Sequence, residues 1–305
     1  MQLSVGRVMT IETAWDEYRG WSARARELQS SAQRWNRAAL ISAGTAAVLG
    51  AAATQTAGDP GLGKTLSLLA AMAAALTPIL GKEILSSGSE TKWIRARATA
   101  EAIKSECFRF AARAGDYAKP DAEDVFIARR NELALNAAKD GLTQKSTPAG
   151  AAGDKRRPPD VLDAAWYIPS RIDDQITYYS TKQGEHEQAA KRLRYLAFAS
   201  SAAAALFGVA GLVNQQVFAP WIGAMTTIAT AIAAYGLLDR REHLAATFGA
   251  MATSLGRIKE RAGSIAFVEL VTRAEDLMQS EHAAWTEVMT RTVAKPPAGG
   301  DQPRG

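Results

Sequence analysis

The eight residues GDPGLGKT, from Gly58 to Thr65, match the phosphate-binding pattern G-x-x-x-x-G-K-[ST] at every required position. In a nucleotide hydrolase the glycines let backbone amides surround a phosphate, the lysine reaches the terminal phosphates and the threonine holds magnesium. That chemistry requires a short buried strand before the loop. Here the preceding 20 residues are uncharged and rich in alanine, too long for such a strand. We therefore interpret the pattern as a turn around Asp59 and Pro60.

No other residues have the spacing of a catalytic or metal site. The histidines His186, His243 and His282 lie far apart, and neither a nucleophile elbow nor a Cys-His signature is present. The single cysteine, Cys107, cannot form an intramolecular disulfide, and we expect it to be buried. We expect no enzymatic activity, no metal and no cofactor. The alternative, an ATP-hydrolysing enzyme, predicts magnesium-dependent turnover that is lost in Lys64→Ala.

Four nearly uncharged stretches alternate with densely charged ones. Twenty helical residues are about 30 Å long, which is the hydrocarbon thickness of a bilayer. The second stretch is shorter, but lysines at its ends can reach the interface. A soluble bundle of alanine-rich helices is the alternative, although the stretches lack the polar face of a soluble surface helix. The predicted spans are residues 38–57, 65–80, 195–214 and 219–238.

Basic residues are distributed unevenly around these spans. Near the span ends on one side we count thirteen, whereas the two short loops on the other side carry only Lys64. The positive-inside rule therefore places both termini in the cytoplasm. The formal charge of +5 is explained by this topology and not by a nucleic-acid surface. The thirteen are Arg24, Arg26, Arg34, Arg37, Lys82, Lys92, Arg95, Lys182, Lys191, Arg192, Arg194, Arg240 and Arg241.

Small and hydroxyl-bearing residues recur within the spans. Small residues four apart allow helix backbones to approach closely in lipid, and hydroxyls can bond to backbone carbonyls, so helix packing is the simpler interpretation. The alternative is that they line a water path through an oligomer. No charged residue lies inside a span, which argues against a charge-selective filter. The candidate pore-lining or helix-contact residues are Ser42, Thr45, Ser200, Ser201, Gly223, Thr226, Thr227 and Thr230.

The charged segments repeat one plan in the two halves of the chain. Apolar residues at alternating three- and four-residue spacing run from Trp93 to Tyr117 and from Leu244 to Ile265, as in helices that pack in a bundle or coiled coil. We predict an all-α integral membrane protein with two tandem helical-hairpin units and long cytoplasmic helices. The predicted domains are residues 10–140 and 161–293, separated by a flexible linker at 141–160 and followed by a disordered tail at 294–305.

Two segments of the second half resemble a bacterial family. Residues 167–182, YIPSRIDDQITYYSTK, resemble the signature Y-x3-R-[VIL]-x-D-Q-x2-[WY]-Y-x2-K that opens one SLATT subfamily, and residues 267–289 resemble its closing helix. AWDEYRGWSARA and WIRARATAEAIKSECFRFAARAGDY in the first half resemble the SLATT subfamily commonly placed upstream. SLATT denotes the SMODS- and SLOG-associating two-transmembrane effector. The resemblance implies two membrane helices per domain and a membrane-perturbing or pore-forming effector in nucleotide-linked conflict and anti-phage systems.

The functional hypothesis that follows is an oligomeric effector of the bacterial inner membrane. The alternative is a membrane-anchored helical scaffold that binds a cytoplasmic partner without a pore. The expected partners are the lipid bilayer, further copies of the chain and an upstream sensor protein or ligand that carries a nucleotide signal, with no nucleic acid. The family-motif residues, to which the resemblance assigns no chemistry and which we interpret as packing and ion-pairing residues, are Arg171, Asp174, Gln175 and Tyr179.

Overall fold

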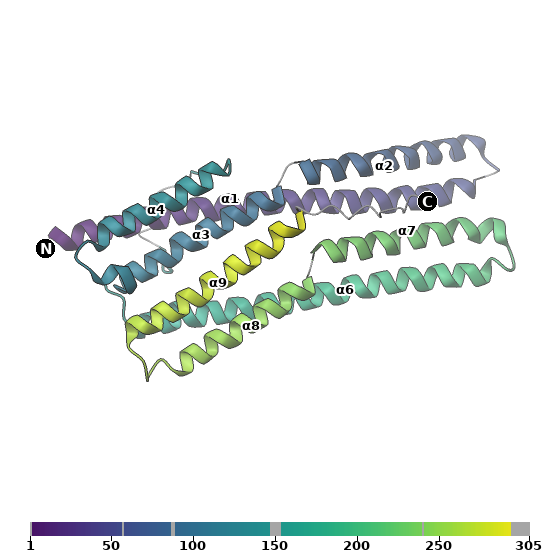
Figure 1. Ribbon diagram of the computed structural model, residues 1–305. Helices are drawn as coiled ribbons and strands as arrows, with labels where there is room; N and C mark the ends of the chain where they lie inside the picture. The colour runs from purple at the N-terminus through teal and green to yellow at the C-terminus, as the bar shows by residue number, and fades with distance from the viewer. Residues whose placement is uncertain (1, 57, 87–88, 147–153, 240, 294–305) are drawn as a thin grey trace, which may run out of the picture. The chain divides into compact units, whose positions relative to one another are not determined.

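The computed structural model describes residues 2–56, 58–86, 89–146, 154–239 and 241–293. It is 85% helical, and the described residues contain no strand, which confirms the predicted all-α class. The elements are α1 (Gln2–Thr54), α2 (Pro60–Ser86), α3 (Ser89–Ala111), η1 (Gly115–Ala118), α4 (Ala122–Lys139), α5 (Ala164–Tyr167), η3 (Ile168–Asp173), α6 (Asp174–Ala210), α7 (Gln215–Asp239), α8 (Arg241–Glu260) and α9 (Phe267–Val293) (Figure 1).

Four helical segments are long and apolar enough to cross a membrane, as judged by their length and composition. In each segment, at most 11% of the most apolar 18-residue stretch is buried within the protein. Large side chains such as Phe198 and Leu206 are 72% and 71% exposed. Such exposure of apolar side chains is expected on a surface that faces lipid, and not in the core of a soluble protein. The segments are Thr10–Thr54, Pro60–Gly81, Ala164–Ala210 and Gln215–Glu260.

The compact units of the structure do not follow the two halves of the sequence. Unit 1 takes charged helical segments from both halves, and unit 2 takes the apolar hairpins of both. Unit 1 comprises Met1–Gln29, Ser89–Tyr179 and Ala250–Gly305, and unit 2 comprises Ser30–Gly88 and Ser180–Gly249. Each unit therefore combines parts of both predicted domains.

Unit 2 contains two antiparallel helical hairpins, one from α1 and α2 and one from α6 and α7 (Figure 1). In the first, the Ser42 hydroxyl donates a hydrogen bond of 2.7 Å to the Ala73 carbonyl across the hairpin. In the second, the rings of Phe207 and Phe218 stack with centroids 6.1 Å apart. Such contacts hold each pair of helices together without a large apolar core.

The turns of the hairpins lie earlier in the chain than the gaps that the predicted spans leave at 58–64 and 215–218, because α2 begins at Pro60 and α7 at Gln215. Helix α2 begins at Pro60, because the Asp59 carboxylate accepts hydrogen bonds from the amides of Gly61 and Leu62 at 3.0 and 3.1 Å. A capping aspartate followed by proline is a favoured helix start. The GDPGLGKT residues thus follow a helix and open another, and the amides that a P-loop would direct at a phosphate bind Asp59 instead.

Helix α3 ends at Ala111, six residues before the end of the predicted apolar seam at Tyr117. The Ala114 amide donates to the Arg109 carbonyl at 2.9 Å, and Arg113 has a left-handed φ of 55°. This is a left-handed helix cap, which the apolar spacing does not reveal. Helix α8 also ends before its predicted seam does, at Glu260 and short of Ile265, so both helices are shorter than the apolar spacing predicts.

The core of unit 1 is built around aromatic side chains. Phe108 lies at the centre of one cluster, with its ring centroid 6.0 Å from those of both Trp15 and Tyr167. In a second cluster Phe110 stacks on Phe126 at 4.5 Å. These contacts join α1, α5 and α4 to α3, which also packs along α9. Burial of such large rings provides most of the driving force for assembling unit 1.

The predicted flexible linker is packed against unit 1 at both of its described ends. The Asp154 carboxylate accepts a hydrogen bond of 3.1 Å from the Trp15 indole, and Leu142 is buried. A Cβ atom on Gly20 would lie 2.7 Å from the Lys145 carbonyl oxygen, so this glycine permits a close approach to α1. Residues at both described ends of the predicted linker thus contact unit 1, while residues 147–153 and the predicted tail at 294–305 lie outside the described residues.

Candidate functional site

The family-motif residues lie where two short elements, α5 and η3, continue into the long helix α6. Asp163 caps α5 by accepting a hydrogen bond of 2.8 Å from the Trp166 amide. The next turn, η3, is a wider π-helical turn that contains Pro169. Proline has no amide to donate and so favours a local change of helical pitch. This turn orients Arg171 toward the interior of unit 1, where its side chain is only 3% exposed.

Arg171 forms a buried, two-pronged ion pair with Glu275 of α9. Its Nε and Nη2 atoms donate to Oε1 and Oε2 of Glu275 at 2.9 and 2.8 Å. The Tyr167 hydroxyl donates to the same Oε1 at 2.9 Å, and the guanidinium lies 4.5 Å from the centre of the Phe108 ring. The Glu275 side chain is 0% exposed, so this cluster offers no open face to a ligand. We assign it a role in positioning α9 against the motif.

Sequence reasoning did not single out Glu275. A signal was present, because this acidic residue lies between Leu270, Val271, Ala274 and Met278, all of which are buried. A carboxylate on the apolar side of an amphipathic helix requires a buried partner. Its partner, however, lies 104 residues earlier in the chain, at a distance that local spacing cannot predict.

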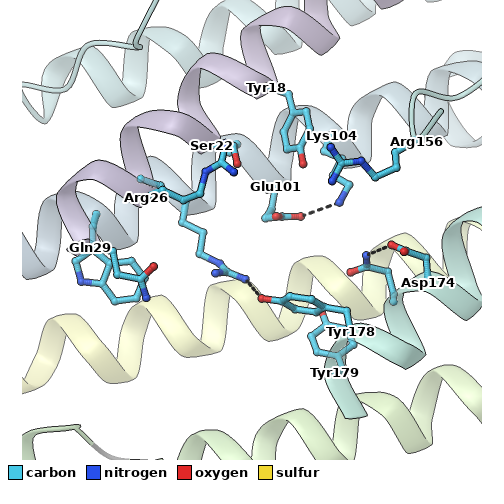
Figure 2. Close-up of a pocket in the computed structure, with 15 residues that line it drawn as sticks. Tyr18, Ser22, Arg26, Gln29, Glu101, Lys104, Arg156, Asp174, Tyr178 and Tyr179 are labelled. Atoms are coloured by element: carbon cyan, nitrogen blue, oxygen red, sulfur yellow. Dashed lines mark hydrogen bonds and ion pairs between the residues drawn. The ribbon is translucent and has the colours of Figure 1, made fainter. Parts of the chain in front are cut away.

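The other motif residues line a pocket of about 330 Å³ in unit 1, between α1, α3 and the start of α6 (Figure 2). Gln175 donates a hydrogen bond of 3.2 Å to the Asp174 carboxylate. Tyr179 is 1% exposed and forms part of the wall beside Tyr178. The Tyr178 hydroxyl accepts a hydrogen bond of 2.9 Å from Arg97. The motif thus supplies one wall of a pocket whose other walls come from α1, α3 and Arg156 of the predicted linker.

The pocket is basic. Four cationic and two acidic side chains line it, a formal excess of two positive charges. In Figure 2 the Lys104 ammonium lies near the Glu101 carboxylate, and the closest distance between their charged atoms is 3.7 Å. The cationic residues are Arg26, Arg97, Lys104 and Arg156, and the acidic residues are Glu101 and Asp174.

The candidate residues of the spans are not gathered around one feature. Ser42 bonds across its hairpin, while four others bond to carbonyls of their own helix, and Thr45 and Thr230 are exposed. A Cβ atom on Gly223 would meet nothing within 4 Å, so this glycine makes no close helix crossing within the protein. The hydroxyls that bond within their own helix belong to Ser200, Ser201, Thr226 and Thr227, at 2.8 to 3.0 Å.

These features define an all-α membrane protein with two helical hairpins and a helical unit that contains a buried ion pair and a basic pocket. Residues 167–285 match the family model described as SMODS and SLOG-associating 2TM effector domain 1, so this part of the chain is similar to a SLATT domain. Residues 16–125 match a family described as a protein of unknown function (DUF4231), which is associated with the same two-transmembrane family. No curated protein and no solved structure matched the chain. The predicted SLATT resemblance of the second half is thereby confirmed, and the first half matches an associated family.

Proposed function

We propose that the protein is an effector of the bacterial inner membrane that assembles into oligomers and permeabilises the bilayer in a nucleotide-linked conflict or anti-phage system. The family match supports the role of membrane effector. The observation that carries the proposal is the exposure of the apolar helices. In each of the four segments, at most 11% of the most apolar 18-residue stretch is buried within the protein. Such surfaces are covered either by lipid or by further copies of the same helices.

Oligomerisation is favoured by the exposed side of α7. Gly223 and Thr227 lie one turn apart on this helix, both are exposed, and Gly223 has no neighbour within 4 Å of its Cβ position. Two small residues four apart allow a second helix to approach closely in lipid. Because two hairpins with few large side chains cannot enclose a water path, permeabilisation requires several copies.

The test is dye release from phosphatidylethanolamine and phosphatidylglycerol vesicles that contain the purified protein, together with chemical crosslinking in the same vesicles. We expect release and crosslinked oligomers with the parent protein. Gly223→Leu adds bulk to the proposed contact and should reduce both by roughly tenfold, without preventing insertion, because leucine is more membrane-favouring than glycine. Ala233→Leu, an exposed change on another side of α7, is the matched control and should behave like the parent.

Two outcomes would count against this proposal. A parent protein that crosslinks but releases no dye would favour the scaffold without a pore. A Gly223→Leu variant that crosslinks and releases dye like the parent would show that this side of α7 is not a contact.

A further inference from the structure

We propose that the basic pocket of unit 1 binds a small phosphate ester that carries a planar ring, the chemistry of a nucleoside phosphate. Its volume of about 330 Å³ lies within the range of small-molecule sites. The family matches assign no ligand to these residues. The inference does not depend on the proposed function, because binding can be measured without any membrane activity.

Arg97 provides the main reason to expect an anion. Its side chain is half-buried in the wall of the pocket. Among the described residues, Arg97 donates a hydrogen bond of 2.9 Å to a neutral group, the Tyr178 hydroxyl. Burial alone would lower the pKa of Arg97, but Tyr178 and Glu101 raise it above its ordinary value, so the guanidinium stays charged. A half-buried guanidinium with free donors matches the two oxygens of a phosphate.

Of the remaining cations, Arg156 is already paired with Asp154, at nitrogen–oxygen distances of 3.2 and 3.4 Å, whereas Arg26 and Lys104 form no strong pair. Arg26 is exposed and forms no ion pair with any described residue. Lys104 is 3.7 Å from Glu101, a long separation for an ion pair, and its ammonium lies 5.5 Å from the centre of the Tyr18 ring. A phosphate would therefore replace weak contacts with charge-assisted hydrogen bonds.

Aromatic side chains provide the second half of the recognition. Tyr18, Trp93 and Tyr178 line the pocket beside the cations, from α1, α3 and α6 respectively. Tyr178 and Trp93 are half-buried, which leaves part of each ring open to a ligand. Stacking on such rings stabilises planar bases with little dependence on their identity. A glycerol phosphate headgroup would use the cations but not the rings, so the pocket favours a ligand with both parts.

The test uses the full chain in detergent and follows its unfolding temperature with AMP, GMP, CMP and UMP as probes. We expect at least one of them to raise this temperature in a saturable way, because a ligand that binds only the folded state stabilises it. Adenosine, ribose 5-phosphate and glycerol 3-phosphate test the two halves of the recognition separately. Each should give a clearly smaller shift than the nucleotide at equal concentration.

Variants connect the effect to the pocket. Arg26→Gln and Lys104→Gln each remove one cation and should weaken nucleotide binding by about tenfold. Lys92→Gln removes a charge from the same helix outside the pocket and should bind like the parent. The proposal is overturned if none of the four nucleotides stabilises the chain, or if both pocket variants bind them as the parent does. An equal shift with glycerol 3-phosphate would overturn the stacking half and point to a lipid headgroup.

Discussion

At the scale of single residues, the buried pair of Arg171 and Glu275 is the feature that ties distant parts of unit 1 together. Removing both charges from water is expensive, and their mutual attraction and hydrogen bonds roughly balance that cost. The pair therefore contributes more to the register of α9 than to net stability. If α9 slid by one turn, both charges would lie buried without a partner, which the native register avoids.

Glu275→Leu should destabilise unit 1 by about 3–5 kcal/mol, because it leaves the Arg171 guanidinium buried and unpaired. The measurement is thermal or denaturant unfolding of the purified protein in detergent. Lys259→Ala is the control, since it breaks an exposed ion pair. The side chains of Lys259 and its partner Asp173 are 44% and 38% exposed, so this variant should lose less than about 1 kcal/mol of stability. Arg171→Leu combined with Glu275→Leu should recover part of the loss. Equal losses in the single variant and the control would refute this role.

Cys107 should be unreactive in the folded protein. Its side chain is fully buried, and burial raises the pKa of the thiol, so the reactive thiolate is scarce at pH 8. We expect maleimide labelling to be roughly a hundredfold slower than in the denatured chain, with opening of unit 1 as the limiting step. Labelling of the denatured chain should accelerate from pH 7 to pH 9 as its thiol ionises. Mass spectrometry of timed samples would measure both rates, and rapid labelling of the native protein would contradict the prediction.

At the scale of elements, the start of α2 decides what the GDPGLGKT residues do. Asp59 occupies the amides at this helix end, and Lys64 lies within the first turns of α2 as an exposed side chain. The same residues in a strand–loop–helix setting would leave the amides free for a phosphate. The difference comes from the helix α1 that precedes them, and not from the pattern itself.

Lys64→Ala should therefore leave dye release within about twofold of the parent, because an exposed interfacial charge contributes little. Asp59→Ala should destabilise the N-terminal turn of α2 by about 1 kcal/mol through loss of its cap. Vesicle leakage and hydrogen exchange of the α2 amides would report the two effects. Magnesium-dependent ATP turnover that disappears in Lys64→Ala would instead show that these residues form a nucleotide site.

The elements also show how far the sequence could predict the structure. The helices and the four apolar segments were predictable, because length, hydropathy and three-four spacing are local properties. The left-handed cap at Arg113 and the wide turn at Pro169 were missed, because neither changes the apolar spacing. The motif drew attention to Arg171 and Tyr179, but the pocket and Glu275 depend on contacts between distant segments. The packed ends of the linker were missed for the same reason.

At the scale of the whole molecule, the uneven distribution of basic residues predicts that both termini are cytoplasmic. Val213 is 91% exposed in the turn between α6 and α7, and Ser264 lies in the turn after α8. With Cys107 unreactive, single cysteines at these positions report topology. We expect Val213→Cys to react with an impermeant maleimide from the periplasmic side, and Ser264→Cys only after the cells are permeabilised. Labelling of Val213→Cys only after permeabilisation would reverse the proposed orientation.

Unit 1 also imposes an order on biosynthesis. Its contacts join α3 to α9, so the ribosome has made both hairpins before it makes the helix that contains Glu275. During synthesis, segments fold as their partners emerge, and the partner of Arg171, Glu275, is synthesised about a hundred residues later. A nascent or prematurely terminated chain therefore presents inserted hairpins without a finished unit 1. The membrane segments are therefore made before the helices of unit 1 can finish packing against one another.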